Sequence, residues 1–258
     1  MQNRIWPKIT LTDDQLFRHR IGPLSIFLKK SADEVWVASS RDDNRDGDPE
    51  ELPEKPEWMR IALPITFQEF QISPVLPNLP VVIDTDFIYR FFSQTRTRVY
   101  TRIPAFARIT PAARPDLVIA ELPTVILSET WFGIFTEGEL SYALSSSVRK
   151  AITKDLYEPH LIICPIQIWN KSDQELKFEK VCLRVARLSV FASRDALWSD
   201  ETLITYHGTE IDSDIEMQGM LPAEAGKGEL VSSPRIQIKR SIGLRTFKFL
   251  RDFHLPGF

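Results

Sequence analysis

The sequence predicts a mainly β protein: an antiparallel β-sandwich of immunoglobulin-like or jelly-roll-like type, with two β units and a C-terminal amphipathic helix. Three observations support this fold class. Apolar and polar residues alternate along much of the chain, 18 prolines interrupt it, and no regular helical segment separates the alternating stretches. Because such segments would serve as the crossovers of a parallel sheet, their absence predicts antiparallel pairing.

The composition is that of an ordinary globular protein. The chain has 258 residues, of which 43% are hydrophobic and 26% are charged, which excludes the disordered and fibrous classes. No apolar run approaches the roughly 18 residues of a membrane-spanning helix, and residues 1–7 lack the apolar stretch of a secretory signal. We therefore expect a cytoplasmic location. Cys164 and Cys182 are expected to be free thiols.

The first half of the chain contains several short predicted strands. Leu24, Ile26 and Leu28 alternate with their neighbours, and Met59 and Ile61 begin a second such pattern. Residues 42–56 form a charged loop between these strands. Residues 42–47 (DDNRDG) have the opening spacing of an EF-hand, but the twelfth position is a proline rather than glutamate. A solvated acidic loop is the favoured interpretation, and neither a metal site nor a cofactor is predicted.

Residues 160–192 are the clearest supersecondary unit. A strand with Ile162, Cys164, Ile166 and Ile168 in one phase meets the polar turn 170–175, and a second strand begins at Leu176. We interpret the unit as a hairpin similar to the central one of an immunoglobulin-like sandwich. The apolar phase slips twice along the second strand, which predicts β-bulges.

The chain is expected to divide near Ala151. Residues 1–150 would form an N-terminal β region with proline-rich and acidic loops, and residues 151–258 a C-terminal β-sandwich-like domain that ends in a helix. Residues 220–234 form a second polar loop within the latter. A single intertwined domain is the alternative.

A basic strand face is the first candidate site. In an extended strand Arg96, Arg98, Tyr100 and Arg102 project to one side, and Val99 to the other. Arginine forks and an interleaved tyrosine suit phosphate or nucleic acid. Because the whole chain is not basic, nucleic acid is not favoured, and a solvated face opposed by the acidic loop is the preferred interpretation.

Residues 127–140 (LSETWFGIFTEGEL) are the second candidate site. Glu129, Glu137 and Glu139 could act as catalytic carboxylates or hold a metal, and Trp131 could contact a ligand. No histidine spacing or nucleophile motif accompanies them, so no metal site is predicted. The alternative is a structural corner with Trp131 and Phe132 packed inward and glycines at positive φ.

The third candidate is a C-terminal amphipathic helix over residues 241–254. On a helical projection, Ile242, Phe249, Leu250 and Phe253 share one arc. The cations on the opposite side are Arg240, Arg245, Lys248 and Arg251. Such a helix could dock on the β domain, or it could bind an acidic protein or an anionic membrane surface.

Several peptides together resemble a known family. They are residues 74–80 (PVLPNLP), 121–124 (ELPT), 130–133 (TWFG), 137–140 (EGEL) and 197–198 (LW). This set is similar to the uncharacterised prokaryotic family known as domain of unknown function 432, over nearly the whole chain. The resemblance implies a prokaryotic source and supplies no reaction, cofactor or catalytic residue.

Three functional hypotheses follow. The first is a non-enzymatic β-sandwich protein that acts as a binding or accessory module in a prokaryotic cytoplasm. The second is a hydrolase or carbohydrate-active enzyme that uses Glu129, Glu137 or Glu139. The third is a protein that associates with a membrane or a partner through the basic C-terminal helix.

Overall fold

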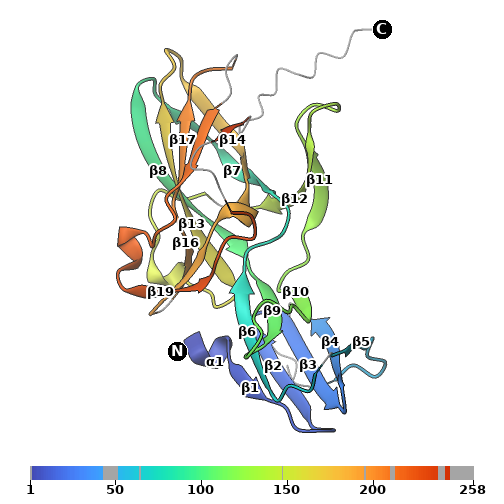
Figure 1. Cartoon of the computed structure of the whole chain (residues 1–258). Helices are drawn as coiled ribbons and strands as arrows, with labels where there is room; N and C mark the ends of the chain where they lie inside the picture. The colour runs from blue at the N-terminus through green and yellow to red at the C-terminus, as the bar shows by residue number, and fades with distance from the viewer. Residues whose placement is uncertain are drawn as a thin grey trace.

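Strands dominate the chain, as the alternation predicted (Figure 1). The computed structural model describes residues 2–42, 52–63, 65–146, 148–194, 196–209, 213–237 and 242–244. Helical structure within these ranges is limited to short segments: α1 (Gln2–Ile5), η1 (Lys154–Leu156), η2 (Val185–Arg187) and η3 (Ala223–Ala225). None of the helices in these ranges is long and apolar enough to cross a membrane.

Two four-stranded antiparallel sheets lie together at one end of the molecule (Figure 1). One has the order β1 (Lys8–Thr10), β6 (Glu69–Val75), β9 (Phe106–Pro111) and β10 (Ala120–Pro123). The other is a meander with the order β2 (Leu16–Ile21), β3 (Leu24–Ser31), β4 (Glu34–Arg41) and β5 (Met59–Ala62). The predicted strands at Leu24 and Met59 are therefore confirmed as β3 and β5.

The other end holds two further sheets. We call the first the arm sheet: β11 (Ser128–Phe132), β12 (Glu139–Ser145), β7 (Val81–Phe91) and β14 (Leu176–Leu183). The second, the large sheet, runs β19 (Gly228–Ser232), β15 (Val190–Ser193), β16 (Leu197–Ser199), β13 (Leu161–Asn170), β17 (Thr202–Tyr206), β18 (Ser213–Met217) and β20 (Ile242–Leu244). Strand β8 (Thr95–Pro104) pairs with β13 along its whole length.

The sheets are mixed rather than purely antiparallel. β12 is parallel to β7, and β13 is parallel to both β16 and β17. The expectation of antiparallel pairing is thus correct for most pairs and wrong for these three. The chain leaves β13 for the arm sheet and returns to the large sheet later, so the other sheet takes the place of a helical crossover.

The predicted hairpin over residues 160–192 has the right strands but the wrong pairing. β13 pairs with β8, and β14 pairs with β7 in the other sheet. The turn at 170–175 is therefore a β-arch, which links two facing sheets. β7 and β8 are joined by a second arch next to it. Asn170 is fully buried and bonds both arches: its amide donates to the carbonyls of Phe91 and Gln174 at 3.1 and 2.8 Å.

The two predicted phase slips have different structural causes. The first is a bulge, where the register of β14 against β7 shifts between Phe178 and Lys180. The second is the 3-10 turn η2, which separates β14 from β15. A change of apolar phase marks an irregularity in both cases, but only the first is a bulge.

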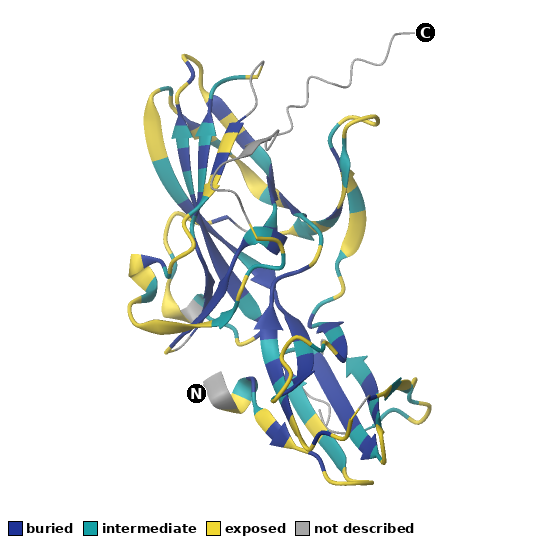
Figure 2. Cartoon of the chain, in the orientation of Figure 1, coloured by how far each residue is buried: buried dark blue, intermediate teal, exposed yellow. Residues whose placement is uncertain are grey.

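One apolar core extends through the molecule (Figure 2). It includes Ile26 and Phe70 at the N-terminal end and Ile103, Ile166 and Phe178 at the other. The pairs β8–β13 and β7–β14 also join residues on both sides of Ala151, which favours the intertwined arrangement. A boundary near Ala151 stays a prediction.

Both cysteines are free, as predicted, and both are buried. Cys164 belongs to the main core, whereas Cys182 lies in a small separate cluster with Val82 and Phe132. Burial raises the pKa of each thiol to about 12. The thiolate, which is the reactive form, is therefore strongly disfavoured at both positions.

Two expectations fall largely outside the described residues. Ile242–Leu244 form β20, which pairs with β18, so the predicted helix is wrong for these three residues. Edge pairing with β18 satisfies their backbone groups in place of helical bonds. The rest of that segment, with Arg245, Lys248 and Arg251, lies outside the described residues. The same is true of residues 43–51, which make up most of the acidic loop 42–56.

Candidate functional site

The basic face of β8 is largely occupied by ion pairs within the chain. Val99 is buried on the core side, and Arg98 and Arg102 lie on the other. Arg98 bonds Glu201 at 2.6 Å and also contacts Glu224. Arg102 donates to Glu158 at 3.2 Å and to the carbonyl of Leu156 at 3.0 Å. These acids come from the C-terminal half of the chain, whereas an acidic loop near residue 50 was expected.

Tyr100 completes the network around Glu224. Its hydroxyl donates to Glu224 Oε1 at 3.0 Å, and its ring packs edge-on against Trp198. Burial alone would raise the pKa of Glu224, but hydrogen bonds from its backbone, Tyr100 and Arg98 hold it below its ordinary value. Burial, with the bond to Glu224, raises the pKa of Tyr100. Near neutral pH the Glu224 carboxylate therefore stays ionised and the Tyr100 phenol stays neutral. Because Arg98 is already paired with Glu201 and Glu224, it is poorly disposed to bind an external phosphate.

Arg96 has a different environment. Its guanidinium lies 4.0 Å from the ring centre of Trp169, and the Lys171 ammonium lies 3.9 Å from the same ring. Such contacts contribute roughly 0.5–1 kcal/mol each at exposed sites. These contacts hold Arg96 of β8 against Trp169 and Lys171 at the end of β13. A role of Arg96 in ligand binding stays a prediction.

The second candidate segment forms a protruding hairpin, which we call the arm (residues 128–145: β11, β12 and their turn). Figure 1 shows it standing apart from the rest of the molecule, attached where β12 pairs with β7. Gly133 in the turn has a φ of 109°, a conformation that favours glycine. At Gly138 a Cβ would lie 2.2 Å from Trp131 Nε1, so the absence of a side chain lets the indole lie across the turn.

The arm separates Trp131 from Phe132. Phe132 is buried, as predicted, but Trp131 is 49% exposed, and the expectation that it packs inward is wrong. Because neighbouring residues of a strand point to opposite faces, only one of the two could enter the cluster with Val82 and Cys182. The Trp131 indole donates to the carbonyl of Ile134 at 3.2 Å.

The candidate carboxylates do not form one cluster. Glu139 accepts a hydrogen bond from Arg184 at 2.7 Å. Glu129 and Glu137 are exposed, and neither lines the cavities described below. Within the described parts of the chain, no group of three or more histidine, cysteine or acidic residues could hold a metal. A catalytic role for these glutamates stays a prediction.

None of the described strands covers the inner face of the arm. In the body of the arm sheet, Val81, Ile83 and Val181 point into the main core. The strand register places Leu140 and Trp131 on this same face, further out. β7 and β14 lie across the arches from β8 and β13, and β12 and β11 continue beyond β7. Among the residues that the structure describes, the face that is core in β7 therefore meets no facing strand at the arm's end.

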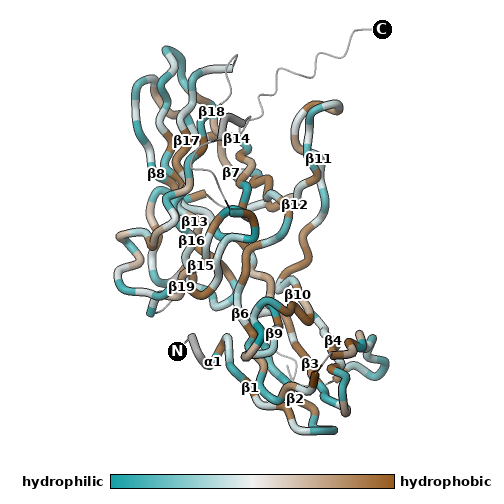
Figure 3. The backbone as a smooth tube through the Cα atoms, in the orientation of Figure 1, coloured by the Kyte–Doolittle hydropathy of each residue, from teal (hydrophilic) through white to brown (hydrophobic). Residues whose placement is uncertain are grey.

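Several apolar side chains of the arm are exposed, and Figure 3 shows where hydrophobic residues fall along its backbone. Phe135 at the tip is 94% exposed and Leu140 is 44% exposed, and Ile134 lies beside them. Ile134 and Phe135 were not singled out from the sequence. The signal was present, however, since a tight turn cannot bury all the apolar residues of the run from Trp131 to Phe135.

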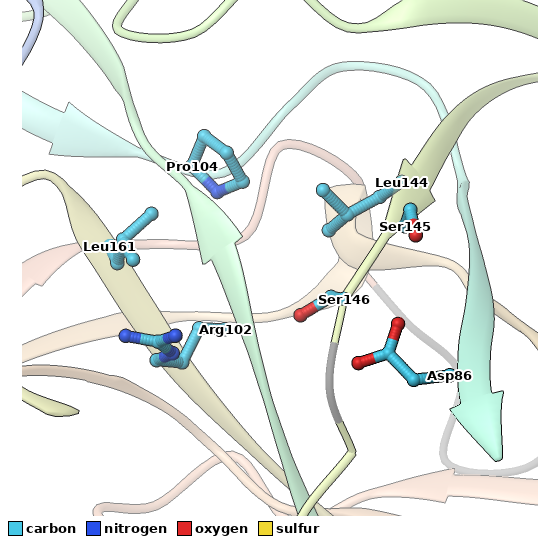
Figure 4. A pocket seen from close by; sticks show the side chains of 7 residues that line it. All are labelled: Asp86, Arg102, Pro104, Leu144, Ser145, Ser146 and Leu161. Atoms are coloured by element: carbon cyan, nitrogen blue, oxygen red, sulfur yellow. The ribbon is translucent and has the colours of Figure 1, made fainter. Parts of the chain in front are cut away.

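Two small cavities lie near the base of the arm, with volumes of about 270 and 150 Å³. The larger is lined by Asp86, Arg102, Pro104, Leu144, Ser145, Ser146 and Leu161. Figure 4 shows Asp86 beside Ser146, with the Arg102 guanidinium turned away from both. Arg102 is ion-paired with Glu158 at 3.2 Å, so its charge is already compensated within the chain.

Asp200 is a buried carboxylate with a structural role. It accepts hydrogen bonds from the backbone amides of Ser189 at 2.7 Å and Gly219 at 2.9 Å. Burial raises its pKa above the ordinary value. Each of the two carboxylate oxygens of Asp200 is engaged by a backbone amide, so we assign this side chain to holding the chain at Ser189 and Gly219.

The model of a protein family of unknown function, DUF432, matches residues 5–251. The chain belongs to this family. Neither the curated proteins nor the solved structures contain a match to it. In this DUF432 chain, two of the peptides that carry the resemblance, 130–133 and 137–140, lie at the end of the arm. Two others, 74–80 and 121–124, lie where the two pairs of sheets meet.

Proposed function

We propose that this DUF432 chain is a non-enzymatic β-sandwich protein of a prokaryotic cytoplasm that binds another protein through the arm. The sandwich architecture is supported by the two β-arches, which connect facing sheets across one apolar core. The two free, buried thiols suit a reducing compartment. The observation that carries the binding role is the uncovered apolar face of the arm.

The energy available at this face is large enough for specific binding. Full burial of an aromatic or large aliphatic side chain contributes about 1.5–3 kcal/mol. Trp131, Phe135 and Leu140 all retain much of that surface. Tryptophan and other large anchors that cluster in this way typically dominate the affinity of a protein interface.

The backbone of the arm offers a second means of recognition. β11 is an edge strand, since the arm sheet has the order β11-β12-β7-β14. An edge strand presents unpaired amide and carbonyl groups to a strand from a partner. Strand addition would supply backbone hydrogen bonds, and the exposed Trp131 would contact side chains of the partner.

Site-specific photo-cross-linking in the producing cell tests this proposal. A benzophenone side chain replaces Phe135, and a matched variant carries it at Phe92, which is 74% exposed but lies on the turn between β7 and β8. We expect discrete adducts from position 135 that disappear when Trp131→Ser is added, and none from position 92. Equal labelling at the two positions, or no adduct at 135, would refute the proposal.

The two other hypotheses have less support. An enzyme that uses Glu129, Glu137 or Glu139 would need converging carboxylates, and Glu139 is instead bonded to Arg184. Binding of an anionic membrane or an acidic protein through Arg245, Lys248 and Arg251 stays a prediction that vesicle cosedimentation would test.

A further inference from the structure

We propose that the protein partner of the arm presents an extended segment in which an apolar residue and a lysine or arginine stand two residues apart. This partner chemistry rests on the function proposed above, since it concerns the same surface. Four features of the arm carry it: the edge strand β11, the fixed indole of Trp131, the position of Glu129 and the negative charge of the hairpin.

Trp131 is a preformed anchor for an apolar side chain. Its side chain is largely exposed, yet its indole nitrogen donates to the carbonyl of Ile134 at 3.2 Å. Gly138 faces the ring, and a Cβ there would lie 2.2 Å from the indole nitrogen. A side chain that is held in place before binding loses little conformational freedom when a partner arrives, which favours association.

Glu129 stands two residues before Trp131 in β11, so both side chains belong to the inner face of the arm. Glu129 is exposed. In a strand added beside β11, the residues opposite Trp131 and Glu129 are also two apart, whether the added strand is parallel or antiparallel. An apolar residue at the first position and a cation at the second would therefore pair with both.

The arm has no cation of its own to neutralise Glu129. Between Ile126 and Val148 the sequence contains three glutamates and no aspartate, lysine, arginine or histidine. Glu139 is bonded to Arg184 at 2.7 Å, whereas Glu129 and Glu137 are exposed and form no salt bridge within the described part of the chain. The apolar surface is thus bordered by negative charge, which a cation on the partner would complement.

The same charge disfavours a second copy of this chain as the partner. If two β11 strands paired antiparallel about Thr130, Glu129 of each copy would lie opposite Trp131 of the other. The two Glu129 residues would then be diagonal neighbours on one face, roughly 7–8 Å apart. Like charges repel at this separation, and a different protein with a basic segment avoids the repulsion.

Two synthetic peptides of identical composition test this inference on the purified full-length protein. Each contains one benzophenone-bearing phenylalanine and one arginine among threonines. The first peptide places these two residues two apart, on one face of a strand, and the second places them three apart, on opposite faces. After irradiation, mass spectrometry measures the yield and position of covalent adducts. We expect about threefold more adduct with the first peptide, the scale of a cross-strand ion pair, and its position in the arm.

Charge reversal gives a second readout. Glu129→Arg should abolish the preference for the first peptide, and a version of that peptide with glutamate in place of arginine should then label the variant better. Ser128→Arg is the matched control, because it adds a cation to the other face of β11 and should leave the preference intact. Trp131→Ser should lower labelling by both peptides.

Equal labelling by the two peptides, adducts outside the arm, or an intact preference in Glu129→Arg would overturn the inference. A dimer of the purified protein that Trp131→Ser dissociates would overturn it too, since a second copy would then occupy the arm.

The two proposals can fail separately, because the peptides are tested without any cellular partner. Adducts from position 135 in cells together with equal peptide labelling would keep the binding role of the arm and remove the basic partner. Selective peptide labelling without cellular adducts would keep the preference of the surface and remove the proposed function.

Discussion

The side-chain amide of Asn170 donates a hydrogen bond to the backbone carbonyl of Phe91, 3.1 Å away, and so links the arch between β13 and β14 to the arch between β7 and β8. The same amide bonds the carbonyl of Gln174, while its oxygen accepts from the backbone and hydroxyl of Ser172. One buried side chain thus satisfies backbone groups in two separate turns.

Asn170→Asp should destabilise the protein by about 3 kcal/mol or more at neutral pH. The change replaces a buried donor with a carboxylate that faces carbonyl oxygens, and unpaired buried charge is strongly unfavourable. Urea denaturation would measure the loss. Gln94→Glu is the matched control, since Gln94 also donates to this turn, at Lys171, but is exposed and should have a much smaller effect. Equal losses in the two variants would contradict the role assigned to Asn170.

Glu121 should stabilise the fold only while it is ionised. It bonds Arg108 at 2.6 Å and Arg235 at 2.8 Å. Burial alone would raise the pKa of Glu121, but the bonds and charges of Arg235 and Arg108 hold it below its ordinary value. The stabilisation is therefore fully present above the unfolded pKa of about 4.3 and is lost as the pH falls through the folded pKa.

We expect Glu121→Gln to lower the free energy of unfolding by about 2 kcal/mol at pH 7, since a partly buried charge pair is broken. The difference from the wild type should shrink below about pH 4. Chemical denaturation at a series of pH values would measure it. Asp116→Asn removes an exposed pair with Arg114 and should change stability little. A pH-independent loss for Glu121→Gln would show that the ion pairs are not its source.

Gly22→Ala should destabilise the protein through both backbone and packing. Gly22 has a φ of 57°, and a Cβ there would lie 2.4 Å from His160 Nδ1, which is buried. Gly219→Ala isolates the backbone contribution, since Gly219 has a φ of 65° and open space around it. Strain of this kind costs about 1 kcal/mol, and we expect a clearly larger drop in the melting temperature for Gly22→Ala. Similar drops would mean that His160 moves aside at no cost.

The two thiols should be inert in the folded protein and reactive once it unfolds. Burial raises the pKa of Cys164 and of Cys182 to about 12, so little thiolate exists near neutral pH. A thiol reagent added to the native protein should react far more slowly than with a small free thiol. Under denaturing, non-reducing conditions it should count two thiols. A count of zero in fresh protein would reveal a disulfide.

Strands were more predictable from the sequence than their partners. Alternation around Ile162 and Ile166 identified β13 correctly, because burial of one face imposes a period of two. The pairing of β13 with β8 depends on residues far away in sequence, and a polar turn looks alike in a hairpin and in an arch. The fully buried Asn170 distinguishes the two only in three dimensions.

The candidate site was only partly predictable for the same reason. The unusual composition of residues 127–140 pointed to the segment that forms the arm. The exposure of Trp131 depends on how far the arm extends beyond the facing large sheet. A local sequence pattern contains no information about that distance. Likewise, the acids that neutralise Arg98 are more than 100 residues away, at Glu201 and Glu224.

The pairing of β8 with β13 also sets an order of events during synthesis. β8 ends at Pro104, and the ribosome must add more than 50 further residues before β13 begins at Leu161. At roughly 5–20 residues per second, β8 waits several seconds for its partner. The meander β2–β5, whose strands are neighbours in sequence, has no such delay. A stalled nascent chain that ends near residue 150 should therefore contain a completed meander and a β8 strand that has not yet paired with β13. Misfolding, and protection from it by chaperones, should matter most during this interval.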